Sequence, residues 1–162
     1  RSGRRLQRYN EGIRLVVGCV PYRITNNAST STSTSSSSSS SSSVEDLEVL
    51  LISSQKSPKL MFPKGGWELD EDIELAASRE TLEEAGVVGS IGGKLGEWTF
   101  KSKSQEKFHR GSMFSLLVTE ELDHWPEKIQ RRRVWMGVNE AWEACSDEWM
   151  KEALDSFVKR FT

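Results

Sequence analysis

Short apolar runs alternate along the chain with polar segments, and the length of each run predicts a strand. Residues 13–22 (IRLVVGCVPY) and 47–52 (LEVLLI) are rich in aliphatic and β-branched side chains, as buried strands are. Further strands of the same character are predicted at residues 92–100, 112–119 and 133–138. Residues 63–66 (PKGG) predict a turn after the second run.

Segments of helical composition lie between and after these strands. Residues 73–85 predict a helix, and Gly86 follows them as a typical C-terminal residue. Asn139 is expected to cap a short helix, and Asp147 a final amphipathic one. The apolar positions of that final helix are Trp149, Leu154, Phe157 and Phe161. Elements in this order predict an α/β or α+β sandwich, in which helices cover a mixed sheet.

A serine-rich stretch, residues 26–43, separates the first two predicted strands. It cannot bury apolar surface, so we expect a disordered loop. A long flexible loop adds little closure entropy, whereas a lone strand ahead of a domain boundary could not fold by itself. We therefore expect a single domain, residues 1–162, with residues 26–43 inserted between two strands of its sheet.

Charged residues are segregated along the chain, although the formal net charge is only −2. Acids concentrate in residues 70–84, and basic residues gather in residues 1–8, 101–110 and 131–133. Hydrophobic content is 36%, a value that the serine stretch dilutes, so the remaining chain can build a core. The charge pattern suits metal-binding acids that face a cationic surface collecting a polyanion.

The cysteines and the hydropathy favour an intracellular protein. Cys19 and Cys145 form no CxxC pair, and Cys19 lies in an apolar run, so we interpret it as a reduced core thiol. No apolar stretch approaches the roughly 20 residues that cross a bilayer. We expect a cytoplasmic monomer with no membrane or nucleic-acid partner. The nucleus and the mitochondrion stay open, because the basic RSGRRLQR segment would suit the end of a transit peptide.

Three glutamates lie close together in the segment RETLEEAGV, residues 79–87. On a helical wheel Glu84 is about 40° to one side of Glu80 and Glu83 about 60° to the other, so they share one face. The same face carries two alanines, Ala76 and Ala77. On the opposite side we expect Leu75, Leu82 and Ala85 to pack on the sheet.

The clustered carboxylates have two interpretations. They can form the solvated face of an ordinary acidic helix, although like charges at i,i+4 cost about 0.2–0.5 kcal/mol per pair. Alternatively they bind a divalent cation, which would remove that repulsion. Oxygen ligands without histidine or cysteine favour a hard ion, Mg²⁺ or Mn²⁺.

The spacing of these residues resembles the Nudix box, G-x5-E-x7-R-E-U-x-E-E-x-G-U with U aliphatic. The matching positions are Gly65, Glu71, Arg79, Glu80, Glu83, Glu84, Gly86 and Val87. Thr81 departs from the pattern, since an aliphatic residue is usual there. The resemblance implies the Nudix fold, an α/β/α sandwich, and Mg²⁺-dependent hydrolysis of a diphosphate linked to another moiety.

The resemblance also implies roles for the box residues. Glu80 and Glu84 would be the principal metal ligands, and Glu83 a further ligand or the base that deprotonates the attacking water. Arg79 would orient Glu83 through a salt bridge. Gly65 would offer a backbone carbonyl to a metal. This chemistry is reasonable because attack on an anionic phosphorus needs cations that neutralise charge and activate water.

Outside the box the chain resembles plant-like diphosphoinositol polyphosphate phosphohydrolases. The similar segments include LLISSQKSPKLMFPKGGWE, MFSLLVTEELDHWPE and RRRVWMGVNEA. The substrate implied is an inositol pyrophosphate, whose many phosphates need a lining of arginine and lysine. The phosphate contacts implied are Arg8, Arg14, Ser53, Lys64, Gly65, Gly66, Lys107 and Arg131.

Two alternatives accompany this prediction. Relatives in the same branch hydrolyse diadenosine polyphosphates, a reaction that an aromatic clamp at the pocket would support. A non-catalytic module that binds polyanions is the other alternative, but such a module would be expected to lose box glutamates. We expect His109 to be a hydrogen-bonded structural group rather than a base.

Overall fold

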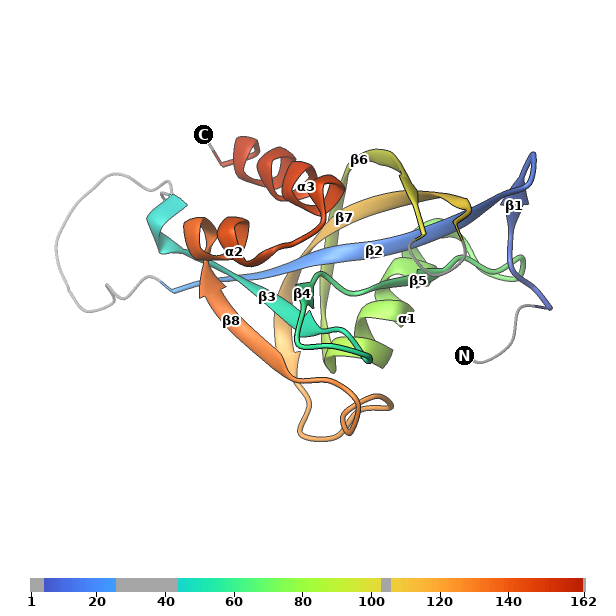
Figure 1. The fold of residues 1–162 in the computed structure, drawn as a ribbon. Helices are drawn as coiled ribbons and strands as arrows, with labels where there is room; N and C mark the ends of the chain where they lie inside the picture. Colours follow the sequence, from blue (N-terminus) through green and yellow to red (C-terminus); the bar gives the residue numbers. More distant parts are fainter. Residues whose placement is uncertain (1–4, 26–43, 103–105, 162) are drawn as a thin grey trace, which may run out of the picture.

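A computed structural model describes residues 5–25, 44–102 and 106–161 of the protein. The order of its elements interleaves strands with helices (Figure 1). The strands are β1 (Tyr9–Asn10), β2 (Ile13–Ile24), β3 (Leu47–Ser53), β4 (Leu60–Met61), β5 (Lys64–Gly66), β6 (Val87–Lys101), β7 (Phe108–Glu121) and β8 (Arg133–Gly137). The helices are α1 (Ile73–Ala85), α2 (Val138–Ala144) and α3 (Glu148–Lys159), and a 3-10 turn, η2 (Val44–Asp46), precedes β3.

The strands form one mixed sheet, as the sequence predicts. Its central order is β4-β3-β2-β7-β6, with β1 and β5 also paired to β2 and β8 to β3. The pairing of β2 with β7 is parallel, and the other pairs of named strands are antiparallel. On the side away from β7, the long strand β2 pairs with three strands in succession. Ile13 and Arg14 pair with β1, Val16–Gly18 with β5, and Tyr22–Ile24 with β3.

Helices cover both faces of this sheet (Figure 1). One core cluster joins Val20, Leu51 and Met113 of the sheet to Leu154 and Phe157 of α3. A second cluster joins alternate residues of the same strands to the alanines of α1. The α/β/α sandwich that the Nudix resemblance implies is therefore confirmed.

Helix α1 has the limits that the sequence predicts, and both ends have a local cause. The Asp72 side chain accepts a hydrogen bond from Leu75 N at 2.9 Å, which caps the first turn. Gly86 adopts a left-handed conformation with φ 69°, and its N–H donates to Leu82 O at 3.0 Å. A side chain would be strained there, so glycine ends the helix.

The packing face of α1 differs from the prediction. Leu75 is 59% exposed, whereas Ala76 and Ala77 are fully buried against the sheet. Glu80 and Glu84 lie on this buried side too, at 8% and 7% exposure. Of the three residues expected to pack on the sheet, Ala85 is buried there, but Leu75 is exposed and Leu82 is only half-buried, because close approach of helix and sheet requires small side chains. The carboxylates therefore point between the two layers instead of away from them.

Three smaller expectations also need correction. Residues 64–66 form strand β5 rather than a free turn, because their backbone pairs with β2. Asn139 is not a cap, since α2 begins at Val138 and its N-cap residue is Gly137. Asp147 stands at the N-cap position of α3, but its carboxylate binds Lys59 Nζ at 3.0 Å and makes no capping hydrogen bond.

The serine-rich residues 26–43 lie outside the described residues. The strands that flank them, β2 and β3, are antiparallel neighbours, and Ile24 and Leu47 are partners in their register. No helix in the described ranges is long and apolar enough to span a membrane.

Candidate active site

The acidic side of α1 faces strand β5, so helix carboxylates meet strand backbone. Lys64 N donates to Glu84 Oε1 at 3.1 Å. A Cβ built on Gly65 would overlap the carboxylate of Glu80. Glycine is thus needed at residue 65 because a carboxylate occupies the space of its side chain.

Arg79 is the main cation among these carboxylates, and its principal partner is Glu71. The guanidinium contacts Glu71 through Nη2 at 2.5 Å and Nε at 2.9 Å. It also reaches Glu80 at 2.9 Å, Gly66 O at 3.1 Å and Glu83 at 3.3 Å. The hydrogen bonds that Arg79 donates to Glu71, and then the nearby charges of Glu80 and Glu71, raise the pKa of Arg79 above its usual range, although burial opposes the shift. Arg79 therefore joins α1 to β5 and to the segment before the helix.

Burial makes the inner carboxylates costly to ionise. Desolvation raises the pKa of Glu84 to about 7, although nearby Arg131 and Lys64 oppose the shift. Desolvation also raises the pKa of Glu80, with Arg79 opposing it. The pKa of Lys64 is lowered, again mainly by burial. The site thus holds acids that are poorly compensated by protein cations alone.

The segment of residues 122–133 clamps the C-terminal end of α1. The last carbonyls of a helix have no hydrogen-bond donor within the helix, and here residues 122–133 supply the donors. The hydrogen bonds are Glu127 N to Glu83 O (3.1 Å), Trp125 Nε1 to Glu84 O (3.1 Å), Arg133 Nη1 to Ala85 O (3.0 Å) and Gly86 O (3.1 Å), and Leu122 N to Gly86 O (2.8 Å). The same segment carries Arg131, whose guanidinium lies 3.3 Å from Glu84 and 2.7 Å from Glu127.

The donor chemistry of the site fits a hard divalent cation. Glu80 and Glu84 offer buried carboxylate oxygens beside the backbone of Gly65. Within the described ranges, however, no three acidic, histidine or cysteine side chains are arranged to hold a metal ion together. Glu80 instead contacts Arg79, and Glu84 contacts Arg131. These carboxylates would have to turn from the arginines toward a bound cation.

A cleft of about 530 Å³ opens beside the carboxylates. Glu80, Glu83 and Glu84 line it, as do the following residues expected to contact phosphate: Arg14, Lys64, Gly65, Gly66 and Arg131. The structure therefore brings together eight of the residues singled out in the sequence, and the roles expected for them stay predictions.

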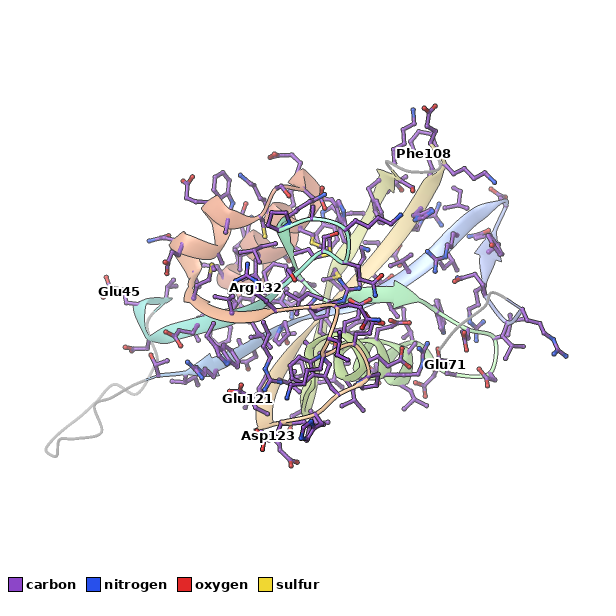
Figure 2. All side chains as sticks on the ribbon, turned by 60° about the horizontal axis from the view of Figure 1, so that its bottom comes forward. Glu45, Glu71, Phe108, Glu121, Asp123 and Arg132 are labelled. Atoms are coloured by element: carbon purple, nitrogen blue, oxygen red, sulfur yellow. The ribbon has the colours of Figure 1, made fainter. Side chains whose placement is uncertain are left out.

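Three residues expected to contact phosphate do not line this cleft. Arg8 stacks on Trp67 at 4.3 Å and donates to the carbonyls of Glu68, Leu69 and Glu71. Ser53 is buried and accepts a hydrogen bond from Arg132 N at 2.8 Å. Lys107 is exposed and precedes Phe108, which lies at the opposite end of β7 from Glu121 (Figure 2).

Further charged and polar residues of the cleft were not predicted from the sequence as site residues. They include Gln7, Lys56, Lys59, Glu68, Lys101, Glu127 and Asp147. Spacing could not have revealed them, because they come from separate loops and strands that only the fold brings together. Glu71 in the box precedes α1 (Figure 2), and its role as the main partner of Arg79 was likewise not predicted.

An aromatic pair forms part of the cleft wall. Phe100 and Trp149 both line the cleft and stack on each other, with ring centroids 4.4 Å apart and planes 5° apart. His109 also lines the cleft and meets Phe100 edge-on at 5.5 Å. Each stacked ring has one face covered by the other, so no base can enter between them.

Comparison with known proteins defines the class of the fold and the site. The family model of the NUDIX domain matches residues 43–159. The chain belongs to the Nudix family and is a Nudix hydrolase. Such hydrolases generally use a divalent metal such as Mg²⁺ and act on small-molecule substrates.

Particular relatives share most of the chain. It is 55% identical over 164 residues to Nudix hydrolase 17, mitochondrial, of Arabidopsis thaliana, covering 100% of this chain and 83% of that protein. It is 40% identical over 97 residues to diphosphoinositol polyphosphate phosphohydrolase 3-alpha of Mus musculus, covering 58% of this chain and 57% of that one. The solved Ap4A hydrolase of C. elegans superposes with a TM-score of 0.64 at 19% identity, covering 93% and 99% of the two chains, and this likeness concerns the fold alone.

Proposed function

We propose that the protein hydrolyses the β-phosphate of diphosphoinositol polyphosphates, giving an inositol polyphosphate and orthophosphate. One observation carries the proposal: a single cleft is lined both by the box carboxylates and by a large set of cations. Those cations are Arg14, Lys56, Lys59, Lys64, Lys101 and Arg131. A ligand with phosphates in several directions suits cations that come from several elements. The partial similarity to the mouse phosphohydrolase supports the same substrate class.

In this proposal Glu80, Glu84 and the Gly65 carbonyl hold Mg²⁺, with Mn²⁺ as an alternative. When bound, such a cation neutralises phosphate charge and lowers the pKa of water. Glu83 is half-buried at the cleft and would accept a proton from the attacking water, or serve as a further ligand. Arg79 contacts both Glu80 and Glu83 and would keep them in place.

The cations have a separate part in binding. Lys64 lies next to Gly65 in β5 and would contact the phosphate that is cleaved, while Arg14 and Arg131 would bind phosphates on the ring. Arg8, Ser53 and Lys107 would act at a distance from the cleft, since none of them lines it.

Diadenosine polyphosphate hydrolysis is the second candidate. Phe100, the half-buried member of its stacked pair with the buried Trp149, lines the cleft and would offer an aromatic surface to a purine base. From the sequence alone, no aromatic pair was obviously placed for adenine stacking. The solved Ap4A hydrolase shares the fold, but at 19% identity this likeness does not indicate the substrate of this chain.

The catalytic proposal is tested with Glu83→Gln, which keeps the size of the side chain and removes its charge. Phosphate release from an inositol pyrophosphate with Mg²⁺ should fall by roughly 100-fold or more, the scale of general-base catalysis. Glu74→Gln is the matched control, because Glu74 lies exposed on the first turn of the same helix. Equal rates for wild type and Glu83→Gln would contradict the proposed role. Absence of phosphate release from both would exclude this substrate and favour a binding module.

The two substrates are separated by comparing rates with inositol pyrophosphates and diadenosine polyphosphates under one metal condition. We expect the inositol pyrophosphates to be cleaved with the higher kcat/KM. The reverse order of kcat/KM would favour diadenosine polyphosphate hydrolysis instead.

The compartment is a separate question. The name of the Arabidopsis relative favours the mitochondrion over the cytoplasm expected from the sequence.

A further inference from the structure

Gln7 is a buried polar residue on the wall of the cleft. Its side chain is 7% exposed and lies between the N-terminal segment, β2 and the end of β5. Nε2 donates to Leu15 O at 2.8 Å, Arg8 O at 2.9 Å and Trp67 O at 3.3 Å. Oε1 accepts from Arg14 Nε at 2.9 Å. Both ends of the amide are therefore engaged.

These neighbours fix the orientation of the amide. Carbonyl oxygens can only accept hydrogen bonds, so the amide nitrogen of Gln7 must face Leu15, Arg8 and Trp67. The guanidinium of Arg14 can only donate, so it must face the amide oxygen. A reversed amide would place oxygen against three carbonyls and nitrogen against a cation. The amide oxygen of Gln7 is therefore held in one orientation as a hydrogen-bond acceptor for Arg14.

Gly66 gives independent support for the importance of this contact. A Cβ built on Gly66 would overlap Gln7 Oε1 and would lie 2.9 Å from Arg14 Nη2. Gly66 does not have a left-handed conformation that would by itself require glycine. The absence of a side chain at residue 66 therefore makes room for the pair of Gln7 and Arg14. The second glycine of the PKGG segment is explained by packing against that pair.

We propose that Gln7 is a positioning residue that holds the guanidinium of Arg14 in the cleft for a phosphate of the substrate. The proposal rests on the proposed function, because it takes the ligand to be a polyphosphate. With Nε held by Gln7, the Nη groups form the part of Arg14 that a phosphate would reach. A fixed arginine loses less side-chain entropy when the ligand binds, so binding is tighter.

The contact itself is tested without a ligand, by the NMR signal of the Arg14 Nε–H group, which is assigned with Arg14→Lys. In the wild type this proton should exchange slowly with water, because it is hydrogen-bonded inside the cleft wall. Gln7→Ala should speed its exchange by about tenfold or more, whereas Gln130→Ala, a change at an exposed glutamine, should leave it unaltered. An unchanged signal in Gln7→Ala would overturn the proposal.

The consequence for binding is tested by calorimetric titration with inositol hexakisphosphate, using Gln7→Ala, Arg14→Ala and the double variant. Gln7→Ala should weaken binding about tenfold in the wild-type background and not at all in the Arg14→Ala background. A purely structural role would weaken binding equally in both backgrounds, and that result would overturn the proposal. If the wild type binds no inositol hexakisphosphate while the Arg14 signal responds to Gln7→Ala, the proposed substrate fails and the positioning contact stands.

Discussion

Single residues at the site are explained by what occupies the space and the charge around them. Gly65 and Gly66 leave room for the side chains of Glu80 and Gln7, respectively. Arg79 contacts Glu71 most closely, and Glu80 and Glu83 at longer distances. Gly65 and Arg79 thus allow several carboxylates to lie close together, and no described buried side-chain polar atom is left unpaired.

The raised pKa of Glu84 predicts how stability depends on pH. Its pKa is about 7 in the folded protein, against an ordinary value of 4.5. The protonated carboxyl therefore stabilises the fold fully below about pH 4.5, and this contribution is lost as the pH rises through about 7. Glu84→Gln stays neutral, so without metal it should melt higher than the wild type at pH 8 and at nearly the same temperature near pH 4.5.

Thermal denaturation in a chelator, recorded between pH 4.5 and pH 8, measures this difference. Mg²⁺ should then stabilise the wild type more than Glu84→Gln, because only the wild type gains a partner for the buried charge. A melting difference that is the same across the whole pH range would contradict the assignment of the shift to Glu84.

At the scale of elements, helix α1 can hold its carboxylates in place because contacts with the rest of the protein fix both of its ends and one of its sides. Asp72 caps its start, and residues 122–133 satisfy the carbonyls at its end. Its alanines bring the helix close to the sheet, so that its carboxylates reach β5. The clamp also links the helix to Arg131 at the cleft, and a change in the clamp should therefore affect stability and activity together.

Trp125 is the centre of this clamp. Its indole N–H donates to Glu84 O, its ring lies against Gly86, and the Arg133 guanidinium stacks on it at 4.1 Å. Trp125→Ala should lower the free energy of unfolding by about 2–3 kcal/mol, through lost packing and an unpaired helix carbonyl. It should also lower kcat, because the last turn of α1 carries Glu83 and Glu84.

Denaturant unfolding and steady-state kinetics measure the two effects of Trp125→Ala. Trp142→Ala is the control, since Trp142 is 36% exposed on α2 and its ring contacts only Lys151 among the described cation–aromatic pairs. Trp142→Ala should change both quantities little. Loss of stability in Trp125→Ala without any loss of kcat would show that the clamp does not position the carboxylates.

At the scale of the whole molecule, β2 and β3 pair directly at the point where the chain leaves one strand and enters the other. Ile24 and Leu47 are register partners, so a short turn could join the two strands. Deleting residues 31–42 should therefore leave the melting temperature and the turnover nearly unchanged, because shortening a long loop changes closure entropy only slightly. A marked fall of either quantity in a melting and turnover assay would mean that the deleted residues pack on the fold.

Much of the architecture could be predicted from the sequence. The limits of α1, the apolar strands and the common face of Glu80, Glu83 and Glu84 all followed from the printed residues. The strands β6 and β7 proved longer than predicted, since the polar residues that extend them were not part of an apolar run. The start of α2 was missed because no side chain caps it.

The sequence by itself determined the helix, its caps, the spacing of its carboxylates and the family to which the chain belongs. These features depend on hydrogen bonds and periodicities within a few residues of one another. Only the tertiary structure decided which face of α1 is buried, which cations line the cleft, and that Gln7 and the clamp hold arginines there. Those features depend on contacts between residues far apart in the chain, such as Gln7 with Trp67 or Trp125 with Glu84, and no local pattern encodes such contacts.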